Sequence, residues 1–466
     1  MRTRKDLRKY QARAALRICQ QRRVGLFVDM SLGKTAITLT AIRNLIDQGK
    51  LPHGAWVIAP LTVTKDTWQQ EAQKWSHLKD LKFILVEGKR PAARLKLLKQ
   101  KADVKIISYT LLPWVGELLK NVRKRRPAWL PDLLALDESE HIKGRGKWFR
   151  VIRYRLLRWV DYRVIQTGTP AAHSLFDIWS QIYVLDKGKR LGMNFGIYRS
   201  RFFRQADYMG FKYEPRPGAE ARIYSLVRDI VVRLDGRDWL ELPRVVTDTR
   251  HVELPPRAME LYRRHEREMF IRLDNLREVE AINAAVLSNQ CWQLANGAIY
   301  DDPEERTSFT EIHRAKIDAL RLMIEEAVGN HVMVAYWFKH DRWRLQEAFP
   351  HGVFMNKENL VDVKNRWNKG KIPLLFVSPS SSSYGLNMQY GGHILIWFSQ
   401  IWSGGKHAQL IARLVRPDQR SPHVISRYIS ARDTVDEVIE DSRMQRLEGQ
   451  AAFLDALRRY RRRKAT

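Results

Sequence analysis

An apolar run that leads into a glycine turn most constrains how this chain can fold. Residues 24–35 read VGLFVDMSLGKT, and residues 36–45 then carry apolar side chains at helical spacing. This pattern predicts a buried strand, a tight loop and a helix, which is the unit from which parallel α/β sheets are built. Backbone N–H groups at the start of such a helix attract anions, so the loop is a candidate phosphate-binding site.

The loop ends in Gly33, Lys34 and Thr35. Lysine supplies a mobile positive charge for the outer phosphates of a nucleotide, and the threonine hydroxyl is a ligand for Mg²⁺. The full phosphate-loop pattern has a further glycine where this chain has Val28. On these residues alone, a structural loop in front of a buried helix is an equally good interpretation.

Strand-like apolar runs alternate with helical stretches up to about residue 190. The predicted strands of this part are Gly25–Val28, Ala55–Ala59, Phe83–Val86, Val104–Ile107, Leu133–Leu136 and Arg163–Gln166. The alternation predicts an α/β fold with a parallel sheet that is covered on both faces. Residues 191–250 lose this rhythm and are basic and aromatic, and residues 257–300 read as helical. The alternation resumes after residue 330, which predicts a second α/β lobe.

The charge balance favours a polyanionic partner. The chain has 82 lysine and arginine residues against 51 aspartate and glutamate residues, a net charge of +31 over 466 residues. Nucleic acid is the partner that this excess favours, with an anionic membrane surface as the alternative. No apolar run is long enough for a membrane-spanning helix, and the basic N-terminus lacks the apolar core of a signal peptide. The two cysteines, Cys19 and Cys291, predict no disulfide framework and suit a reducing compartment.

A second candidate part of the site is an acidic pair at the end of a predicted strand. Asp137 and Glu138 directly follow the apolar run Leu133–Leu136. Carboxylates at the carboxyl end of a parallel strand lie at the ligand-binding edge of the sheet. Asp137 is therefore a candidate to hold Mg²⁺ through water, and Glu138 is a candidate to orient or deprotonate an attacking water. The alternative is an acidic pair that caps a helix.

Three polar residues late in the chain share a helical spacing. Gln409, Arg413 and Arg416 stand at i, i+4 and i+7, which places them near one face of a predicted helix. An arginine presented to the γ-phosphate of a nucleotide stabilises the charge of the transition state. The alternative is a surface helix whose side chains form ion pairs.

Taken in order, these segments resemble those of superfamily-two helicases, and specifically the Swi/Snf-type translocases of double-stranded DNA. The loop DMSLGKT at 29–35 resembles the DMGLGKT of that family, which also lacks the early glycine. The acidic pair lies in DESEHIK, which resembles the DEAH box. The other matching segments are LRKYQ at 7–11, VIAP at 57–60, TGTP at 167–170, GLNMQ at 385–389 and QLIARLVRPDQ at 409–419. The compact size suggests the bacteriophage or prophage branch of the family.

The sequence departs from the family pattern at four places. Ser31 replaces a glycine of the loop. Glu140 is the fourth residue of the acidic box, and His141 is displaced by one position. Ala412 stands where an aspartate is usual, and residues 378–383 replace a stretch that is normally richer in glycine.

The resemblance implies an α/β fold of two RecA-like lobes with parallel sheets and helical insertions between them. The implied domains are lobe 1 at 1–190, a basic and aromatic insertion and linker at 191–256, a helical insertion at 257–305, lobe 2 at 306–440 and a basic helical tail at 441–466. The implied cofactors are ATP and Mg²⁺. The implied nucleotide-binding residues are Tyr10, Gln11, Ser31, Leu32, Gly33, Lys34, Thr35, Asp137, Gly385 and Gln409, with Thr35 and Asp137 as metal ligands and Lys34, Glu138, Arg413 and Arg416 as catalytic residues.

The activity implied by the resemblance is ATP hydrolysis coupled to movement along DNA, with little reading of base sequence. Phage DNA replication or recombination is the expected setting, in the cytoplasm of a bacterial host and on its DNA, with a phage replication protein or nuclease as a candidate partner and no membrane association. Three alternatives stay open. These are a helicase that separates strands instead of tracking along the duplex, a DNA-binding scaffold with little ATPase activity, and an RNA-directed helicase.

Overall fold

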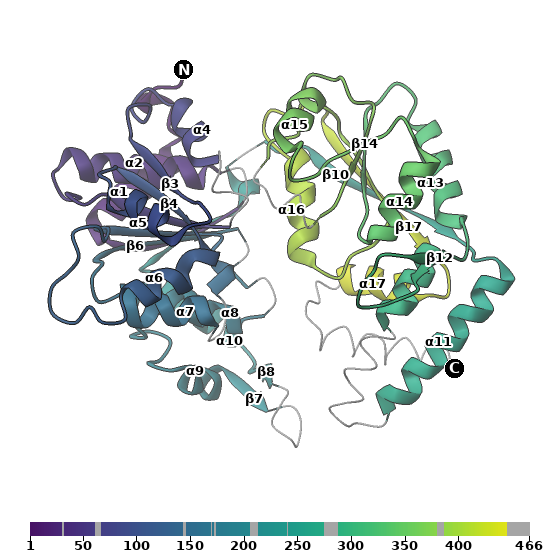
Figure 1. Cartoon of the computed structure of the whole chain (residues 1–466), viewed down its shortest axis with the longest axis horizontal. Helices are drawn as coiled ribbons and strands as arrows, with labels where there is room; N and C mark the ends of the chain where they lie inside the picture. The colour runs from purple at the N-terminus through teal and green to yellow at the C-terminus, as the bar shows by residue number, and fades with distance from the viewer. Residues whose placement is uncertain are drawn as a thin grey trace. The chain divides into compact units, whose positions relative to one another are not determined.

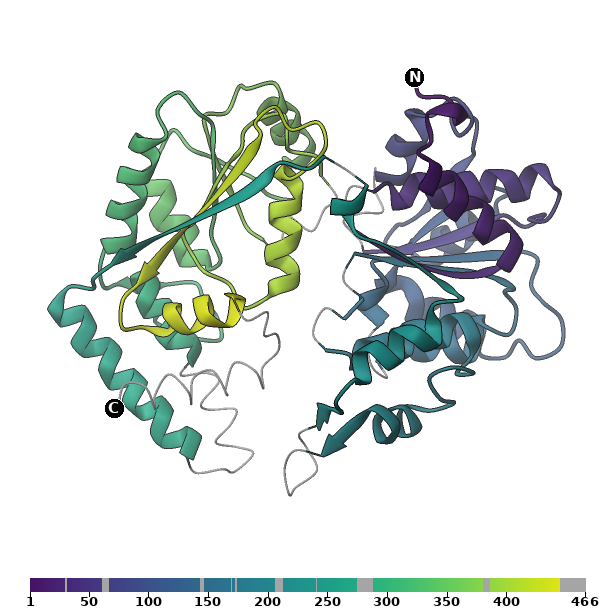
Figure 2. The same cartoon turned by 180° about the vertical axis from the view of Figure 1, so that it is seen from behind.

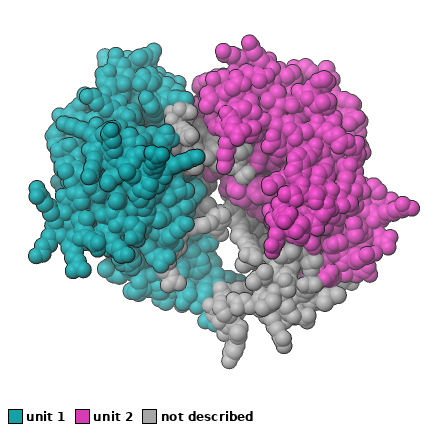
Figure 3. Space-filling view, in the orientation of Figure 1, with its two compact units in different colours: residues 1–240 teal, residues 241–466 magenta. Residues whose placement is uncertain are grey.

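The computed structural model divides the chain into two compact units, residues 1–240 and 241–466 (Figure 3). The structure describes residues 1–29, 32–60, 67–142, 146–168, 170–171, 174–205, 213–239, 241–274, 288–379 and 386–444. Each unit has its own parallel sheet and its own apolar core.

The core of the first unit is a seven-stranded parallel sheet of order β3-β4-β2-β5-β6-β1-β9. Its strands are β1 (Arg23–Val28), β2 (Ala55–Ala59), β3 (Phe83–Val86), β4 (Val104–Ser108), β5 (Leu133–Asp137), β6 (Tyr162–Thr167) and β9 (Val231–Leu234). Every residue of β2, β4, β5 and β6 is buried, because helices cover both faces of the sheet. The strands that continuous apolar runs predicted are therefore present.

Helices pack on both faces of this sheet, with α1 and α2 on one side and α6, α7 and α8 on the other (Figure 1). The helices of the unit are α1 (Lys9–Gln21), α2 (Lys34–Asp47), α4 (Thr67–Gln73), α5 (Pro91–Lys99), α6 (Leu112–Leu118), α7 (Lys147–Val151), α8 (Phe176–Asp186), α9 (Phe195–Phe202) and α10 (Ala219–Val227). A π-helical segment, Ile152–Leu156, continues α7. The short strands β7 (Phe203–Gln205) and β8 (Tyr213–Pro215) pair antiparallel beside α9.

The register of the central strands brings the candidate site residues to one edge. Phe27 of β1 pairs with Thr167 of β6, and Asp137 of β5 pairs with Gln166 of β6. The carboxyl ends of these three strands are therefore level. The loop before α2, the residue after Asp137 and the turn after Thr167 all begin at this edge.

The second unit has a six-stranded parallel sheet of order β10-β17-β16-β13-β15-β14 (Figure 2). Its strands are β10 (Arg244–Val252), β13 (Val332–Ala335), β14 (Val353–Phe354), β15 (Leu374–Val377), β16 (Ile394–Trp397) and β17 (His423–Ala431). Its helices are α11 (Pro256–Asp274), α13 (Ala315–Glu326), α14 (Lys339–Ala348), α15 (Leu360–Asn368), α16 (Gly404–Leu414) and α17 (Val435–Met444). The strands β11 (Ala298–Tyr300) and β12 (Phe309–Glu311) form a separate antiparallel pair. Two parallel sheets with helical additions confirm the predicted fold class.

The boundary between the two units falls between residues 240 and 241, inside the segment 191–256 that was predicted to be an insertion and linker. In the first unit, β9 pairs with β1, so the chain up to residue 240 belongs there. In the second unit, β10 pairs with β17 over nine residues and is a full edge strand. The sequence predicts an insertion and linker here because residues 191–250 lose the alternation of strands and helices. The strand β10 is mostly exposed, and its sequence, RVVTDTRHV, mixes polar and apolar residues. The tail beyond residue 444 lies outside the described residues.

Across the described part of the chain, every helix is too short or too polar to span a lipid bilayer.

Candidate nucleotide site

The glycine loop is held in place by the N-terminal helix. Gly33 has a φ of 79°, in the left-handed region that favours glycine, and α2 begins at the next residue. The Leu32 carbonyl accepts hydrogen bonds from the Tyr10 hydroxyl and from Gln11 Nε2, each at 3.1 Å. The other half of the Gln11 amide, Oε1, accepts from the Arg8 backbone N–H at 2.9 Å. Tyr10 and Gln11, which the resemblance assigns to nucleotide binding, thus fix the backbone of the loop.

The first turn of α2 presents the side chains expected of a phosphate site. Lys34 is half-buried, and its Nζ donates a hydrogen bond to the Val28 carbonyl at 2.9 Å. Thr35 is also half-buried. The backbone N–H groups of the first turn have no acceptor within the helix, so the turn can bind an anion. Ser31, the replaced glycine of the loop, lies outside the described residues.

Asp137 is buried at the end of β5 and receives three hydrogen bonds. The donors are Trp68 Nε1 at 3.0 Å, Gln166 Nε2 at 2.8 Å and the Glu138 backbone N–H at 3.1 Å. Burial raises the pKa of Asp137 to about 6 and the Glu138 charge adds to this, whereas Gln166, Trp68 and the Lys34 ammonium lower it. The Lys34 ammonium therefore lies near enough to Asp137 to act on its carboxylate electrostatically.

Two polar contacts of Asp137 were not anticipated from the sequence. Trp68 comes from α4 and Gln166 from β6, which are 69 and 29 residues away from Asp137. Gln166 is itself oriented by Thr38 of α2, whose hydroxyl donates to Gln166 Oε1 at 2.7 Å. The only signal in the sequence was that Gln166 ends a strand at the same edge of the sheet.

Glu138 has a backbone conformation that is rare for its residue type. Its φ is 47°, in the left-handed region, which costs about 1 kcal/mol or more for a residue with a Cβ atom. Its side chain is half-buried, and Oε2 accepts no hydrogen bond from an N–H or O–H group of the described residues. A carboxylate in a strained turn with an unsatisfied oxygen is suited to accept a proton from a water molecule.

Glu140 occupies the fourth position of the acidic box and is buried. Burial and the neighbouring Glu138 charge raise the pKa of Glu140 well above its usual range, while a hydrogen bond with Thr167 lowers it. Among the described residues, Oε2 of Glu140 accepts no hydrogen bond. His141 is exposed and lies against the Tyr109 ring, with 5.6 Å between ring centroids.

The donor set at this edge fits Mg²⁺. Mg²⁺ prefers oxygen ligands and uses one or two carboxylates together with waters and substrate phosphates. Asp137 supplies a carboxylate, and Thr35 supplies a hydroxyl in the first turn of α2. Among the described residues, no group of three or more histidine, cysteine or acidic side chains forms a complete metal cage by itself.

The remaining candidate residues belong to the second unit. Arg413 is buried on α16, and its backbone carbonyl accepts from the Met388 N–H at 3.2 Å. Gln409 is half-buried on the same helix. Because α16 ends at Leu414, Arg416 lies beyond the helix, and its Nε donates to the Ala412 carbonyl at 3.1 Å. The prediction that all three share one helical face is therefore wrong for Arg416. Gly385 lies outside the described residues.

A family model described as the SNF2-related domain matches residues 11–301, which is more than half of the chain. The chain belongs to the SNF2-related family. Protein p41 of Acyrthosiphon pisum secondary endosymbiont phage 1 is 35% identical to it, over 94% of this chain and 95% of that protein. YwqA of Bacillus subtilis (strain 168) is 26% identical, over 85% of this chain and 43% of YwqA. The chain thus spans nearly all of the phage protein but under half of YwqA.

Among solved structures, the Sulfolobus solfataricus SWI2/SNF2 ATPase core in complex with dsDNA is 18% identical to this SNF2-family chain. The match covers 97% of this chain and 92% of that one, with a TM-score of 0.44.

Family membership confirms the resemblance to Swi/Snf-type proteins that the sequence motifs indicated. The phage relative confirms the predicted phage branch. It also confirms the predicted enzyme class, an ATP hydrolase of the helicase type, and with it the use of a nucleotide.

Proposed function

We propose that this SNF2-family protein hydrolyses ATP with Mg²⁺ and uses the energy to move along DNA. The observation that carries the proposal is the arrangement at the carboxyl edge of the first sheet. There a phosphate-type loop, the Lys34 ammonium and the buried Asp137 carboxylate lie next to Glu138, whose Oε2 has no donor among the described residues. This is the donor set that phosphoryl transfer to water requires.

Each residue has a defined part in this mechanism. Lys34 leaves the Val28 carbonyl and neutralises the outer phosphates, while the first-turn N–H groups of α2 orient them. Thr35 and Asp137 hold Mg²⁺, which neutralises charge on the phosphates when it is bound. Glu138 orients the attacking water and accepts its proton. Trp68 and Gln166 position Asp137 through the hydrogen bonds that they donate to it.

We assign Arg413 and Arg416 of the second unit to the same reaction. A guanidinium near the γ-phosphate stabilises the charge that develops as the bond to the leaving group breaks. If the two units close on the nucleotide and open after hydrolysis, the motion of the units is what drives DNA past the protein.

The net charge of +31 supports DNA as the track. Contacts to phosphates are independent of base sequence and weaken as salt rises, which suits a protein that moves along its substrate. We place this activity in phage DNA replication or recombination inside a bacterial host, with a phage replication protein or nuclease as partner; the phage relative supports the phage setting alone.

The experiment that tests the activity is DNA-stimulated phosphate release by Lys34→Ala and Glu138→Gln. Both substitutions are expected to lower the rate by at least about 100-fold, because each removes a group that acts on the transferred phosphate or on the water. Lys50→Ala is the matched control, since Lys50 is exposed and its ammonium donates to the side chain of the nearby Gln48. Normal rates in either site variant would refute the assignment.

A second experiment tests the arginines. Arg416→Ala is expected to lower turnover while the affinity for a non-hydrolysable ATP analogue stays within about threefold, because the charge it stabilises develops only in the transition state. Arg366→Ala is the control, since Arg366 forms an exposed ion pair with Asp362 in the same unit. Loss of nucleotide binding with normal turnover at saturation would show that the role of Arg416 is wrong.

A further inference from the structure

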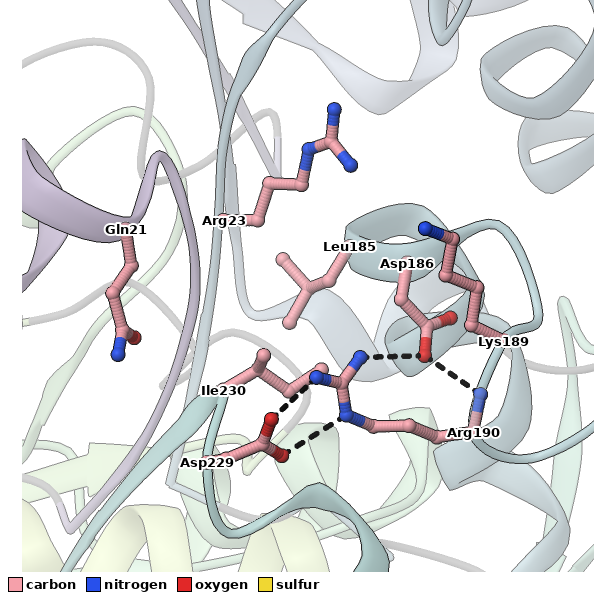
Figure 4. Close-up of a pocket in the computed structure, with 8 residues that line it drawn as sticks. All are labelled: Gln21, Arg23, Leu185, Asp186, Lys189, Arg190, Asp229 and Ile230. Carbon is pink, nitrogen blue, oxygen red and sulfur yellow. Dashed lines mark hydrogen bonds and ion pairs between the residues drawn. The ribbon is translucent and has the colours of Figure 1, made fainter.

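A cavity of about 320 Å³ opens at the amino edge of the first sheet, at the opposite ends of the strands from the nucleotide site. Its walls come from the end of α1, the first residue of β1, the end of α8 and the residues that precede β9 (Figure 4). Its polar lining residues are Gln21, Arg23, Asp186, Lys189, Arg190 and Asp229. None of them has a part in the proposed hydrolysis of ATP.

Arg190 forms ion pairs with both carboxylates of this cavity, those of Asp186 and Asp229. Its Nε and Nη2 donate to the two oxygens of Asp229 at 3.0 and 2.5 Å, and its Nη1 donates to Asp186 Oδ2 at 3.2 Å. Asp186 also accepts from the backbone N–H groups of Gly188 and Arg190, at 2.8 and 2.9 Å. The Arg190 guanidinium holds the pKa of Asp229 below its usual range. Both carboxylates therefore already have hydrogen-bond donors from the residues of the cavity wall.

Arg23 and Lys189 are cations without such partners. In Figure 4 the dashed interactions join Arg190 to Asp186 and Asp229, and none reaches Arg23 or Lys189. Within the part of the chain that the structure describes, neither side chain has a hydrogen bond or an ion pair. The cavity thus presents two positive groups to whatever enters it.

A third positive charge belongs to the strand next to Arg23. Arg163 of β6 is its register partner on the neighbouring strand and is buried. Among the described residues, the Arg163 guanidinium donates to four backbone carbonyls, those of Leu157, Val160, Val184 and Leu185, and to no carboxylate. Burial, followed by repulsion from Arg23, lowers the pKa of Arg163 to about 10, while Asp161 and Asp186 act in the opposite direction. Like charges in adjacent register repel, and an anion beside Arg23 relieves that repulsion.

We propose that this cavity is a second phosphate-binding site, in which Arg23 and Lys189 bind a phosphate group. Guanidinium and ammonium groups form strong, charge-assisted hydrogen bonds with phosphate oxygens, and the guanidinium can do so through two parallel bonds. The cavity volume lies at the lower end of the range for small-ligand sites, so it accommodates a phosphate with part of the group that carries it. That phosphate comes either from a nucleic-acid backbone or from a free ion.

Hydrogen exchange with the full-length protein tests the site without reference to ATPase activity. The probes are inorganic phosphate and a short DNA duplex, and the readout is the exchange of backbone amides at 184–192 and 227–232. Phosphate is expected to slow exchange in both segments in a saturable way. In the double variant Arg23→Gln with Lys189→Gln, about tenfold more phosphate is needed, because two charge-assisted hydrogen bonds are lost.

The matched control is Lys96→Gln with Lys99→Gln. It makes the same change in net charge at two exposed lysines on α5, at a distant part of the sheet, and is expected to leave the phosphate dependence unchanged. Protection by DNA that phosphate competes away identifies the nucleic-acid backbone as the source, and protection by phosphate alone identifies a free ion. No protection by either probe, or equal effects in the two double variants, would overturn the proposal. Phosphate that binds at Lys34 slows exchange in α2 instead, so the two sites are distinguished.

Discussion

The contact between Gly33 and Gln11 gives a quantitative test of how α1 holds the nucleotide loop. An alanine Cβ atom at position 33 would lie 2.4 Å from Gln11 Nε2, which is too close, and Gly33 has a φ of 79°. Gly33→Ala therefore has two costs. The left-handed backbone costs about 1–2 kcal/mol. Displacement of the Gln11 amide breaks its hydrogen bonds to Leu32 and Arg8, which lowers the free energy of unfolding by about 1–3 kcal/mol more, the cost of leaving these groups unpaired.

A double-mutant cycle separates these two costs. Gln11→Ala alone is expected to lower the free energy of unfolding by about 1–3 kcal/mol, because it removes the same two hydrogen bonds. Once position 11 is alanine, Gly33→Ala has only its backbone cost. The double variant is then destabilised by about 1–3 kcal/mol less than the sum of the two single variants.

The assay is urea denaturation of the full-length chain followed by tryptophan fluorescence, with hydrogen exchange of α1 and α2 to assign the transition to the first unit. Gly49→Ala is the matched control. Gly49 also has a positive φ, 68°, but no atom lies within 4 Å of the position of an added Cβ. It is expected to cost only about 1–2 kcal/mol. Additive effects at positions 11 and 33, within about 0.5 kcal/mol, would refute the clamp of the loop by Gln11.

Two further predictions concern buried charges. Because burial and a neighbouring carboxylate raise the pKa of Glu140, the charged form destabilises the fold as pH rises through that pKa. The Tm of Glu140→Gln, measured without Mg²⁺, should therefore rise relative to that of the wild type between pH 5 and pH 9. The exposed control Glu117→Gln is expected to show a difference from wild type that does not change with pH. The same pH-independent difference in Glu140→Gln would contradict the prediction. Lys316 and Asp436 form a fully buried ion pair at 2.5 Å. Lys316→Met should cost about 3–5 kcal/mol in urea denaturation, because it strands a buried carboxylate. A loss below about 1 kcal/mol, as expected for Arg366→Met at an exposed pair, would show that Asp436 does not depend on Lys316.

The sequence predicted those parts of the fold that a local pattern determines. β2, β4 and β5 are continuous apolar runs because they are buried on both faces, so composition alone reveals them. β10 is an exposed edge strand, and its polar residues made it resemble a linker. An edge strand needs apolar residues on one face only, so its signal in the sequence is weak.

The sequence predicted which residues belong to the candidate site, but it did not predict how their side chains are arranged and hydrogen-bonded. Lys34, Asp137 and Glu138 follow predicted strands at one edge, which local pattern and parallel topology together imply. The hydrogen bond from Trp68 to Asp137 joins segments 69 residues apart, and no periodicity encodes it. The left-handed backbone of Glu138 has no sequence signal either, because glutamate rarely adopts it.

Coupling of ATP hydrolysis to DNA is the property on which the proposed function depends. The most direct measurement is the rate of phosphate release by the wild-type protein without nucleic acid and with single-stranded DNA, duplex DNA, forked DNA and duplex RNA in parallel, with Glu138→Gln as the inactive control. We expect duplex or forked DNA to raise the rate at least about tenfold, higher salt to reduce this stimulation, and Glu138→Gln to show none. A rate that is equal with and without DNA, or that only RNA stimulates, would contradict it.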